Sequence, residues 1–469
     1  MNGSFLCSAS LREIHMKTIF GKDDGYRGIW YSCSMQTFGY SGGLGTYCAK
    51  HRPFAVYCEN VRKTFFCYGG TTKSSFTNLL HMVSYYDHEK DVVPRPTILL
   101  DKETGDAHDN PVISVDEEGY IWIFSTAHGT ARSAFVHRST HPYEIDDFEH
   151  VRISGLVDGK QQEITNFSYM QPWYISGKGF LLFHTRYDNP AVRSLWFARS
   201  CDGTHWECWH NQAAIAKGHY EISTAHANCA GTAFNYHPSL SPFIRTNLYY
   251  IETRDLGESW NAADGTPLEL PLTEVINPAL VHDYSSENLL VYLKDILFDP
   301  DGHPVILYLT SAGNMRGPES APRRWTTARW TGQKWLICPA MESDDNYDTG
   351  SLYIEEDGTW RLIVPTDDGP QPNRTGGEMV MWKSNDQGAT WTRTAQITNN
   401  SFHNHSYARR PLNAHPDFYA LWADGNGREP SDSRMYFCDR DGNVRVLPKK
   451  MEEDFARPAA PGDADKPLR

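Results

Sequence analysis

The stretch GDAHDNPVISVDEEGYIWIFSTAHGTARSAFVHR, residues 105–138, contains one complete turn–strand–turn–strand unit. Two short apolar runs, PVISV and YIWIFS, flank the turn DEEG, which is the pattern of two strands joined by a tight connection. His108 stands just before the first run, and His128 stands just after the second. The unit therefore indicates a β-structure, and the histidines at its ends give the first indication of a site.

The same pattern returns along the chain, with a polar residue and usually a proline before a strand, an Asp/Gly turn and a second strand. The units begin at His51, His108, Met170, His237, Asn288, Thr349 and His415. Seven units at intervals of roughly 50 to 70 residues come near the range of propeller blades. We therefore predict an all-β, single-domain, seven-bladed β-propeller over residues 21–448. An N-terminal extension, 1–20, precedes it, and a flexible, charged C-terminal tail, 449–469, follows it.

A second repeat supports this fold. SCDGTHW (200–206), TRDLGESW (253–260) and SNDQGATW (384–391) share a Ser or Thr, an Asp, a Gly and a Trp at nearly constant spacing. The Asp is expected to accept hydrogen bonds from backbone N–H groups, the Gly to adopt a left-handed conformation and the Trp to pack the turn onto its sheet. The motif resembles the Asp-box, or BNR, repeat of sialidase-like propellers. It indicates a fold and says almost nothing about activity.

Composition excludes several classes of function. The chain has 469 residues and a net charge of −14, which argues against a nucleic-acid partner. No run of about 18 apolar residues is present, so no membrane partner is expected. The N-terminus shows no basic segment followed by an apolar one, which leaves the compartment open. No cofactor motif and no compact metal-binding motif occur, so no cofactor and no metal site are predicted. Aromatic residues make up 13%, which suits both strands and sugar stacking.

Histidine, tyrosine and arginine gather at the expected ends of strands. The candidates are His51, His108, His128, Tyr169, Arg186, Tyr220, His237 and the stretch HNHSYARR, residues 403–410, which includes Arg409 and Arg410. Any one histidine is more simply explained as a structural hydrogen-bonding group. As a set they suit a uronic-acid site, in which a cation neutralises the carboxylate, a His or Tyr removes the C5 proton and a Tyr or His protonates the leaving oxygen. That reaction is a β-elimination. Paired carboxylates for a classical glycosidase are only weakly indicated, at Asp109, Asp188 and Asp283.

Longer stretches resemble a known family. GYRGIWY (25–31), YSGGLGTYCAKHRPFAVY (40–57), RPTILLDKETGDAHDNPVISVD (95–116) and QPWYISGKGF (171–180) are similar to a BNR-type propeller family of bacterial polysaccharide degradation. One branch contains ulvan lyases, and another contains exo-α-L-rhamnosidases that release rhamnose from an α-1,4 link to glucuronate. The resemblance implies a seven-bladed propeller, an oligo- or polysaccharide partner with rhamnose and uronic acid, and usually a periplasmic or secreted location.

The resemblance also implies roles for individual residues. In the lyase branch, His108 and His128 match two histidines of the second blade, and Tyr169 and Arg186 match a Tyr and an Arg of the next. In the hydrolase branch, His51 matches a single essential histidine on the opposite face, and His108 and His128 can persist there as a vestigial site. Substrate-binding roles are predicted for Lys50, Arg52, Tyr220, His237, Arg409 and Arg410.

The sequence leaves three functions open. The first prediction is an exo-α-L-rhamnosidase that hydrolyses Rha-α-1,4-GlcA, with His51 as its acid/base group because an imidazole titrates near working pH. The alternative is an ulvan-type lyase that acts through His108, His128, Tyr169 and Arg186. The third is a sugar-binding propeller without catalysis, since a fold alone does not determine activity.

Overall fold

The computed structural model describes residues 21–30, 45–72, 75, 78–130, 132–157, 159–189 and 192–462. The predicted N-terminal extension, 1–20, lies outside these residues. The described part is all-β, as expected, with three short 3-10 helices: η1 (Glu59–Val61), η2 (Ala107–Asp109) and η3 (Gly317–Ser320). No helix among the described residues has the length and apolar character needed to cross a membrane.

The strands form seven sheets of four to six strands within the described residues, and the sheets follow one another in chain order. The first, in spatial order, contains β1 (Gly21–Lys22), β6 (Thr97–Asp101), β4 (Leu80–Asp87), β3 (Lys63–Gly70) and β2 (Ala55–Cys58). The second contains β10 (Phe148–Val151), β9 (Phe135–Ser139), β8 (Ile121–Ser125) and β7 (Pro111–Val115). The third contains β12 (Lys160–Glu163), β11 (Ser154–Val157), β16 (His205–Ala213), β15 (Val192–Ser200), β14 (Gly179–Asn189) and β13 (Ser168–Ile175).

The remaining four large sheets are simple antiparallel meanders. The fourth contains β17 (His219–His226), β18 (Cys229–Tyr236), β19 (Thr246–Thr253) and β20 (Leu280–His282). The fifth contains β21 (Leu290–Phe298), β22 (Pro304–Ser311), β23 (Arg323–Trp330) and β24 (Trp335–Glu342). The sixth contains β25 (Ser351–Ile354), β26 (Trp360–Asp367), β27 (Glu378–Ser384) and β28 (Thr392–Gln396). The seventh contains β29 (Asn404–Arg409), β30 (Ala420–Gly425), β31 (Met435–Cys438) and β32 (Val444–Val446).

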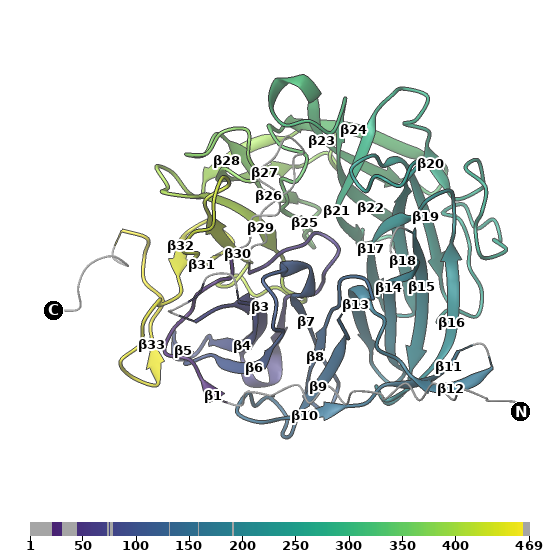
Figure 1. Ribbon diagram of the computed structural model, residues 1–469. Coiled ribbons are helices and arrows are strands. Elements are labelled where there is room, and N and C mark those ends of the chain that lie inside the picture. Colours follow the sequence, from purple (N-terminus) through teal and green to yellow (C-terminus); the bar gives the residue numbers. More distant parts are fainter. Residues whose placement is uncertain are drawn as a thin grey trace, which may run out of the picture.

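The two ends of the described chain lie side by side (Figure 1). Leu412, which follows β29, exchanges backbone hydrogen bonds with Ala55 and Tyr57 of β2, each 2.9 Å long. The segment from Lys449, predicted as a flexible tail, contributes β33 (Phe455–Ala456), which pairs with β5 (Val93–Pro94). The first sheet therefore contacts both the seventh sheet and the residues that follow it.

Five of the seven repeat units contain the two strands that the sequence predicts. The unit from His237 contains only β19, and the unit from His415 contains only β30. In both cases the sheet begins before the unit that the sequence predicts: the fourth sheet begins at His219, and the seventh begins at Asn404. These earlier strands carry polar residues such as Glu221 and His405 inside the molecule, so their apolar alternation is weak.

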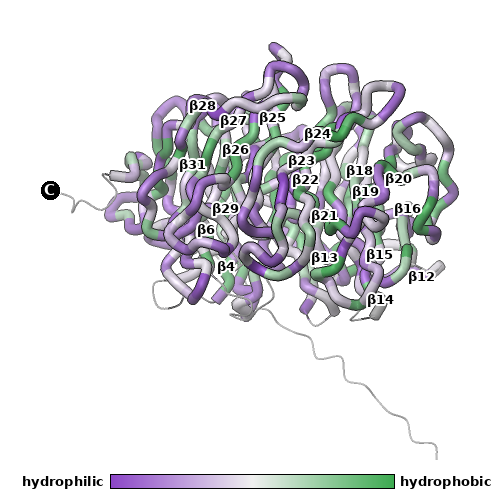
Figure 2. Tube along the Cα trace, turned by 90° about the horizontal axis from the view of Figure 1, so that it is seen from above, coloured by the Kyte–Doolittle hydropathy of each residue, from purple (hydrophilic) through white to green (hydrophobic). Residues whose placement is uncertain are grey.

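The core lies between successive sheets. Hydrophobic residues concentrate in the strands and hydrophilic residues in the connections (Figure 2). One cluster joins the second and third sheets through Trp122, Phe124 and Phe180, and another joins the fourth and fifth through Tyr250 and Ile306. Each sheet buries both faces against its neighbours, which explains why the chain is rich in large aromatic side chains.

The Asp-box turns form as predicted. In the second of them, the Gly257 N–H donates to the Thr253 hydroxyl at 2.7 Å, and the Ser259 N–H donates to Asp255 at 2.9 Å. Trp260 is buried against the third and fourth sheets. The first and third motifs repeat these bonds, with Asp202 and Asp386 as acceptors. The structural role predicted for the Asp-box residues is confirmed.

Substituting Gly257 by Ala should lower the free energy of unfolding by about 2–4 kcal/mol. Gly257 has φ +89°, and an added Cβ would lie 2.3 Å from Cε1 of Phe197. Gly265→Ala is the matched control, because Gly265 has φ +84° but open space around the added atom, so only backbone strain of about 1 kcal/mol applies. Urea unfolding of the two variants checks this. Equal losses would show that the Phe197 contact contributes nothing.

Stability is expected to fall as the pH drops from 6.5 to 5. Burial is the main cause that lowers the pKa of His51, His137 and His184, each to about 3. In the unfolded chain the pKa of a histidine is near 6.5, so between about pH 6.5 and 3 these histidines bind protons in the unfolded state but not in the native state. Their stabilising contribution is complete above about pH 6.5 and is lost progressively as the pH falls toward 3. At pH 5 each of these histidines should lower the free energy of unfolding by about 2 kcal/mol relative to pH 7. Urea unfolding at pH 7 and pH 5 measures this, and unchanged stability would contradict it.

Candidate functional site

One carboxylate, Asp106, holds two histidines together. His108 lies in η2, just before β7, and His128 follows β8; β7 and β8 are antiparallel, with Pro111 opposite Ser125. This pairing brings the two histidines to one end of the second sheet. Asp106 Oδ1 accepts from His108 Nδ1 at 2.6 Å, and Asp106 Oδ2 accepts from His128 Nδ1 at 2.8 Å. The two imidazoles stack with centroids 4.0 Å apart.

The charges at this cluster determine which nitrogen is available. Burial raises the pKa of Asp106, but hydrogen bonding from His128, the charge on His128 and the His108 N–H outweigh it, so the pKa lies below its ordinary value. Burial, then the charge on His128, lowers the pKa of His108 well below the ordinary range. Asp106 is therefore placed to accept an Nδ1–H from each ring. In the neutral form of an imidazole that donates through Nδ1, the lone pair is on Nε2. His108 Nε2 accepts from the Tyr47 hydroxyl at 2.8 Å. His128 is 30% exposed, so its Nε2 can reach a ligand.

Tyr169 lies against both histidines. A parallel bridge between Ala127 and Ser168 places the start of β13 beside His128. The Tyr169 ring centroid is 6.1 Å from that of His108 and 6.2 Å from that of His128. Tyr169 has φ +54° at an irregularity of the β13–β14 pairing, a strained conformation of the kind found at functional sites. Burial raises the pKa of Tyr169 well above its ordinary value, which keeps the phenol protonated.

A chain of donors ends on the Tyr169 hydroxyl. Arg193 stands opposite Tyr187 in the β14–β15 pairing, and its Nε–H donates to the Tyr187 hydroxyl at 2.9 Å. Tyr187 in turn donates to Tyr169 at 3.4 Å. Because the Tyr169 oxygen accepts from Tyr187, its own proton is free to be given to a ligand.

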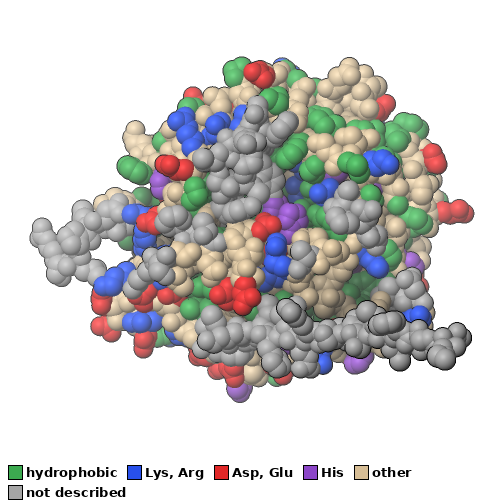
Figure 3. Space-filling model, viewed as in Figure 1, with side chains coloured by type: hydrophobic (Ala, Val, Ile, Leu, Met, Phe, Trp, Pro, Cys, Tyr) green, Lys and Arg blue, Asp and Glu red, His purple; other side chains and the backbone are tan. Residues whose placement is uncertain are grey.

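Cations surround the next aromatic ring, Tyr220 of β17. Lys50 Nζ lies 4.4 Å from the ring centroid, the guanidinium carbon of Arg245 lies 4.8 Å from it, and that of Arg193 lies 5.5 Å from it. Histidine and basic side chains are visible together near the middle of the face in Figure 3. Such a group of cations on an aromatic wall suits an anionic sugar, since the ring offers a stacking surface and the cations bind a carboxylate.

The side chain of Arg186 does not point toward the histidine pair, as its predicted role in the lyase-type site requires. Its guanidinium carbon lies 4.9 Å from the centroid of Trp196. Its neighbour Tyr187 faces the histidines, with its ring centroid 6.2 Å from that of His128. Because successive side chains of a strand point to opposite faces, Arg186 points away from this cluster. Arg193 is the arginine that the structure brings to Tyr169 and Tyr187.

His51 and His237 are buried within the same region. The His51 ring centroid is 5.7 Å from that of Tyr169, so His51 packs behind the histidine pair although it was expected on the opposite face. The His237 ring lies 4.9 Å from Tyr220. Burial first, then the charge of Arg245, lowers the pKa of His237 well below its ordinary value. Both imidazoles are therefore neutral and closed to solvent.

Three predicted binding arginines have structural partners. Arg52 and Arg410 both form ion pairs with the buried Asp295, the second at 3.7 Å. Arg409 donates to the Thr46 carbonyl at 2.8 Å and to the Cys48 carbonyl. Of the predicted binding residues, the structure brings Lys50, Tyr220 and His237 to the region of the histidines and places these arginines in the packing between sheets.

Sequence reasoning missed several members of the cluster, namely Asp106, Tyr47, Tyr187, Arg193, Arg245 and Arg132. Asp106 stands two residues before His108, so its cap position was visible in the sequence. Arg193 follows Tyr187 in the same hairpin, so pairing the two strands around their turn would have placed Arg193 opposite Tyr187. Arg132, which pairs with Asp106 and Asp109, and Arg245, which comes from the fourth sheet, carry no local signal.

Comparison with known proteins gives consistent matches. Residues 80–343 match the model of the BNR repeat-containing family. An ulvan lyase of Alteromonas sp. (strain LOR) is 22% identical over 434 residues, covering 84% of each chain. The solved structure of a PL25 ulvan lyase has a TM-score of 0.68 and 15% identity, over 91% of this chain and 96% of its own. The same kind of lyase bound to -[GlcA(1-4)Rha3S]- has a TM-score of 0.67 and 15% identity, with the same coverage.

These findings correct the first functional prediction. The expected exo-α-L-rhamnosidase is wrong, because the sequence relatives are ulvan lyases, which eliminate rather than hydrolyse, and the similar solved structures are polysaccharide lyases. The geometry supplies a physical reason. A hydrolase of that type needs His51 to exchange protons at working pH, but His51 is fully buried and its pKa is lowered to about 3, first by burial and then by the charge of Arg409.

Proposed function

The chain belongs to the BNR repeat-containing family, and on that premise we propose that it is a polysaccharide lyase that cleaves at uronic acid residues by β-elimination. The single observation that carries the proposal is the Asp106–His128 pair, whose imidazole ring packs beside the proton donor Tyr169. The same ring packs beside Tyr187, whose hydroxyl accepts from the cation Arg193. Elimination needs these three functions together: a base, an acid and a neutraliser of the carboxylate.

We assign the steps as follows. Arg193 binds the uronate carboxylate and stabilises the negative charge that develops there when the C5–H bond breaks. His128 Nε2 takes that proton, while Asp106 holds the ring and stabilises the imidazolium. The electron pair forms the C4–C5 double bond and the C4–O bond breaks. Tyr169 gives its phenolic proton to the leaving oxygen and regains a proton from solvent. His108 and Tyr47 position the pair.

The proposed substrate is a polysaccharide that contains uronic acid and rhamnose. Support comes from the relatives, which are ulvan lyases, and from the similar lyase structure bound to an oligosaccharide of GlcA and Rha3S. The cations around Tyr220 suit an anionic chain of this type. For the fold, we propose that the seven sheets are the blades of a seven-bladed propeller, since they follow in chain order and the last contacts the first.

Incubation with ulvan tests the proposal. The ultraviolet absorbance of unsaturated uronates should rise with time, and it should stay flat with a neutral polysaccharide that lacks uronate. If ulvan retards the protein in an affinity gel while no absorbance develops, the protein is a sugar-binding propeller and the lyase proposal fails.

A further inference from the structure

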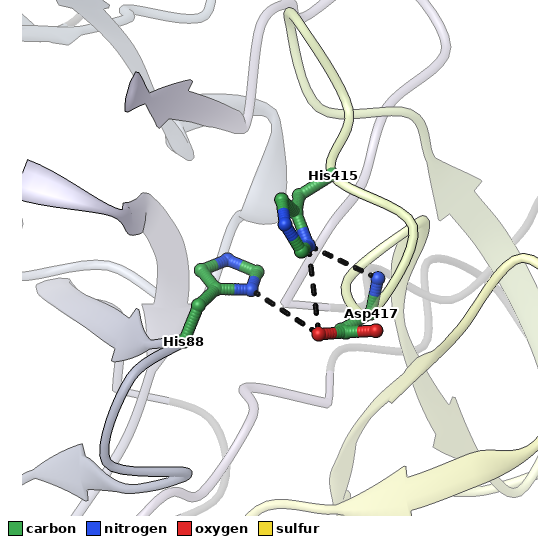
Figure 4. Close-up of side chains that lie close together, drawn as sticks. All are labelled: His88, His415 and Asp417. Carbon is green, nitrogen blue, oxygen red and sulfur yellow. Dashed lines mark hydrogen bonds and ion pairs between the residues drawn. The ribbon is translucent and has the colours of Figure 1, made fainter. Parts of the chain in front are cut away.

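Three side chains from opposite ends of the chain meet outside the histidine pair. His88 directly follows β4 of the first sheet, and His415 and Asp417 lie between β29 and β30 of the seventh. Figure 4 shows the two imidazoles and the carboxylate pointing toward one another. One ligand atom from each residue can be chosen so that all three lie within 4.8 Å of one another.

The separations are too long for hydrogen bonds and near those of ligands around an ion. His88 Nδ1 is 4.0 Å from Asp417 Oδ2, and His415 Nδ1 is 3.7 Å from the same oxygen. Around a tetrahedral zinc ion with bonds of about 2.0–2.1 Å, two ligand atoms are about 3.3 Å apart. Small side-chain shifts would therefore close the three atoms around one ion.

The surroundings of His88 leave its Nδ1 available to bind a metal ion. Its Nε2 is 2.8 Å from the Thr64 hydroxyl, which orients the ring and can accept the Nε2 proton. Its Nδ1 is buried and has no hydrogen-bond partner among the described residues, and the side chain is only 1% exposed. A buried imidazole nitrogen without a hydrogen bond is costly unless something binds there. The rings of Tyr57 and Tyr86 pack against the imidazole, with centroids 5.2 and 4.8 Å away.

His415 and Asp417 are held by one tight turn. The Phe418 N–H donates to the His415 carbonyl at 3.0 Å, with Pro416 inside the turn. The Asp417 N–H donates to His415 Nδ1 at 3.2 Å, so the single lone pair of Nδ1 is directed toward Asp417. An ion bound there would take over that lone pair. Asp417 is 63% exposed, so an ion could enter from solvent and keep a water as its fourth ligand.

We propose that His88, His415 and Asp417 bind a divalent transition metal ion of the zinc class. Two imidazoles and one carboxylate are typical ligands of zinc. The ion would join the first sheet to the seventh, beside the backbone bonds of Leu412 to β2, and so fasten the two ends of the fold. Its role is structural and does not depend on the proposed lyase activity.

Metal titration of the full chain tests the site. Protein freed of metal with a chelator is titrated with Zn²⁺ by calorimetry, and its Tm is measured with and without Zn²⁺. The wild type should gain about 2–5 °C on Zn²⁺ binding, because a ligand that binds only the native state stabilises it. His415→Gln and Asp417→Asn should each lose one equivalent of bound Zn²⁺ and this shift in Tm.

One control variant and one further titration keep the result interpretable. Asp441→Asn, an exposed Asp in the turn between β31 and β32, should bind Zn²⁺ like the wild type. Cobalt titration gives a second readout, since a tetrahedral Co²⁺ site absorbs visible light and this band should vanish in His415→Gln. If His415→Gln and Asp417→Asn keep the wild-type stoichiometry and the Tm shift, the proposed site is wrong, even if Zn²⁺ binds elsewhere.

Discussion

Replacing His128 by Gln should lower kcat for elimination on ulvan by about 10²–10⁴-fold. His128 is the imidazole whose Nδ1 is fixed by Asp106 at 2.8 Å and whose Nε2 faces outward. Gln can keep a hydrogen bond to Asp106 but cannot accept the C5 proton. The rate of absorbance increase at saturating ulvan measures the effect, with KM changed much less than kcat.

His205→Gln is the matched control for this experiment. His205 is an exposed histidine that also bonds an aspartate, Asp202, at 2.8 Å, but it lies in an Asp-box turn. Its substitution should leave kcat within about twofold, because it touches no proposed reacting group. A His128→Gln variant with wild-type activity and an unchanged Tm would show that the base is another residue.

Replacing Tyr169 by Phe should lower kcat by about 10²–10³-fold, the range of a lost general acid. The ring stays, so the contacts with His108, His128 and His51 persist. Only the hydroxyl that gives its proton to the leaving oxygen is removed. Loss of the hydrogen bond from Tyr187 should cost about 1 kcal/mol of stability, which thermal unfolding measures independently.

Tyr187→Phe separates the acid from its support. Tyr187 carries the hydrogen bond from Arg193 toward Tyr169 and lies one step from the reacting atoms. Its loss should reduce kcat by about tenfold, clearly less than the loss of Tyr169. If the two variants lose activity equally, or if Tyr187→Phe loses more, the acid is assigned to the wrong tyrosine.

The sequence predicts local features of this protein well. The Asp-box turns depend on residues within eight positions, and the bonds of Thr253, Asp255 and Gly257 follow directly from their chemistry. The pairing of His108 with His128 is also within reach, because both flank one hairpin. A turn signal and an alternating pattern are sufficient for such features.

Direction and burial are harder to predict. Arg186 and Arg193 belong to the same hairpin, and a difference of one position in register decides which of them faces Tyr169. His51 resembles a catalytic residue in sequence, but the tertiary packing buries it completely and removes its ability to titrate near neutral pH. Neither outcome has a local signal, since each depends on how neighbouring sheets pack.

Contacts between residues that are far apart in the chain cannot be predicted from the sequence alone. Arg245, which directly precedes β19, reaches Tyr220 and Tyr347. His88 meets His415 only because the first and seventh sheets lie side by side. No spacing in the sequence links such residues. The sequence alone therefore gives no indication of the metal site proposed above.

We expect this protein to break the glycosidic bond by elimination at the Asp106–His128–Tyr169 site. Ulvan digested in water labelled with heavy oxygen tests it most directly, with the products analysed by mass spectrometry. Elimination predicts products that carry an unsaturated uronate at the new non-reducing end and no heavy oxygen at the cleaved bond. Products with saturated ends and one heavy oxygen per cleavage would rule out elimination, because they require hydrolysis.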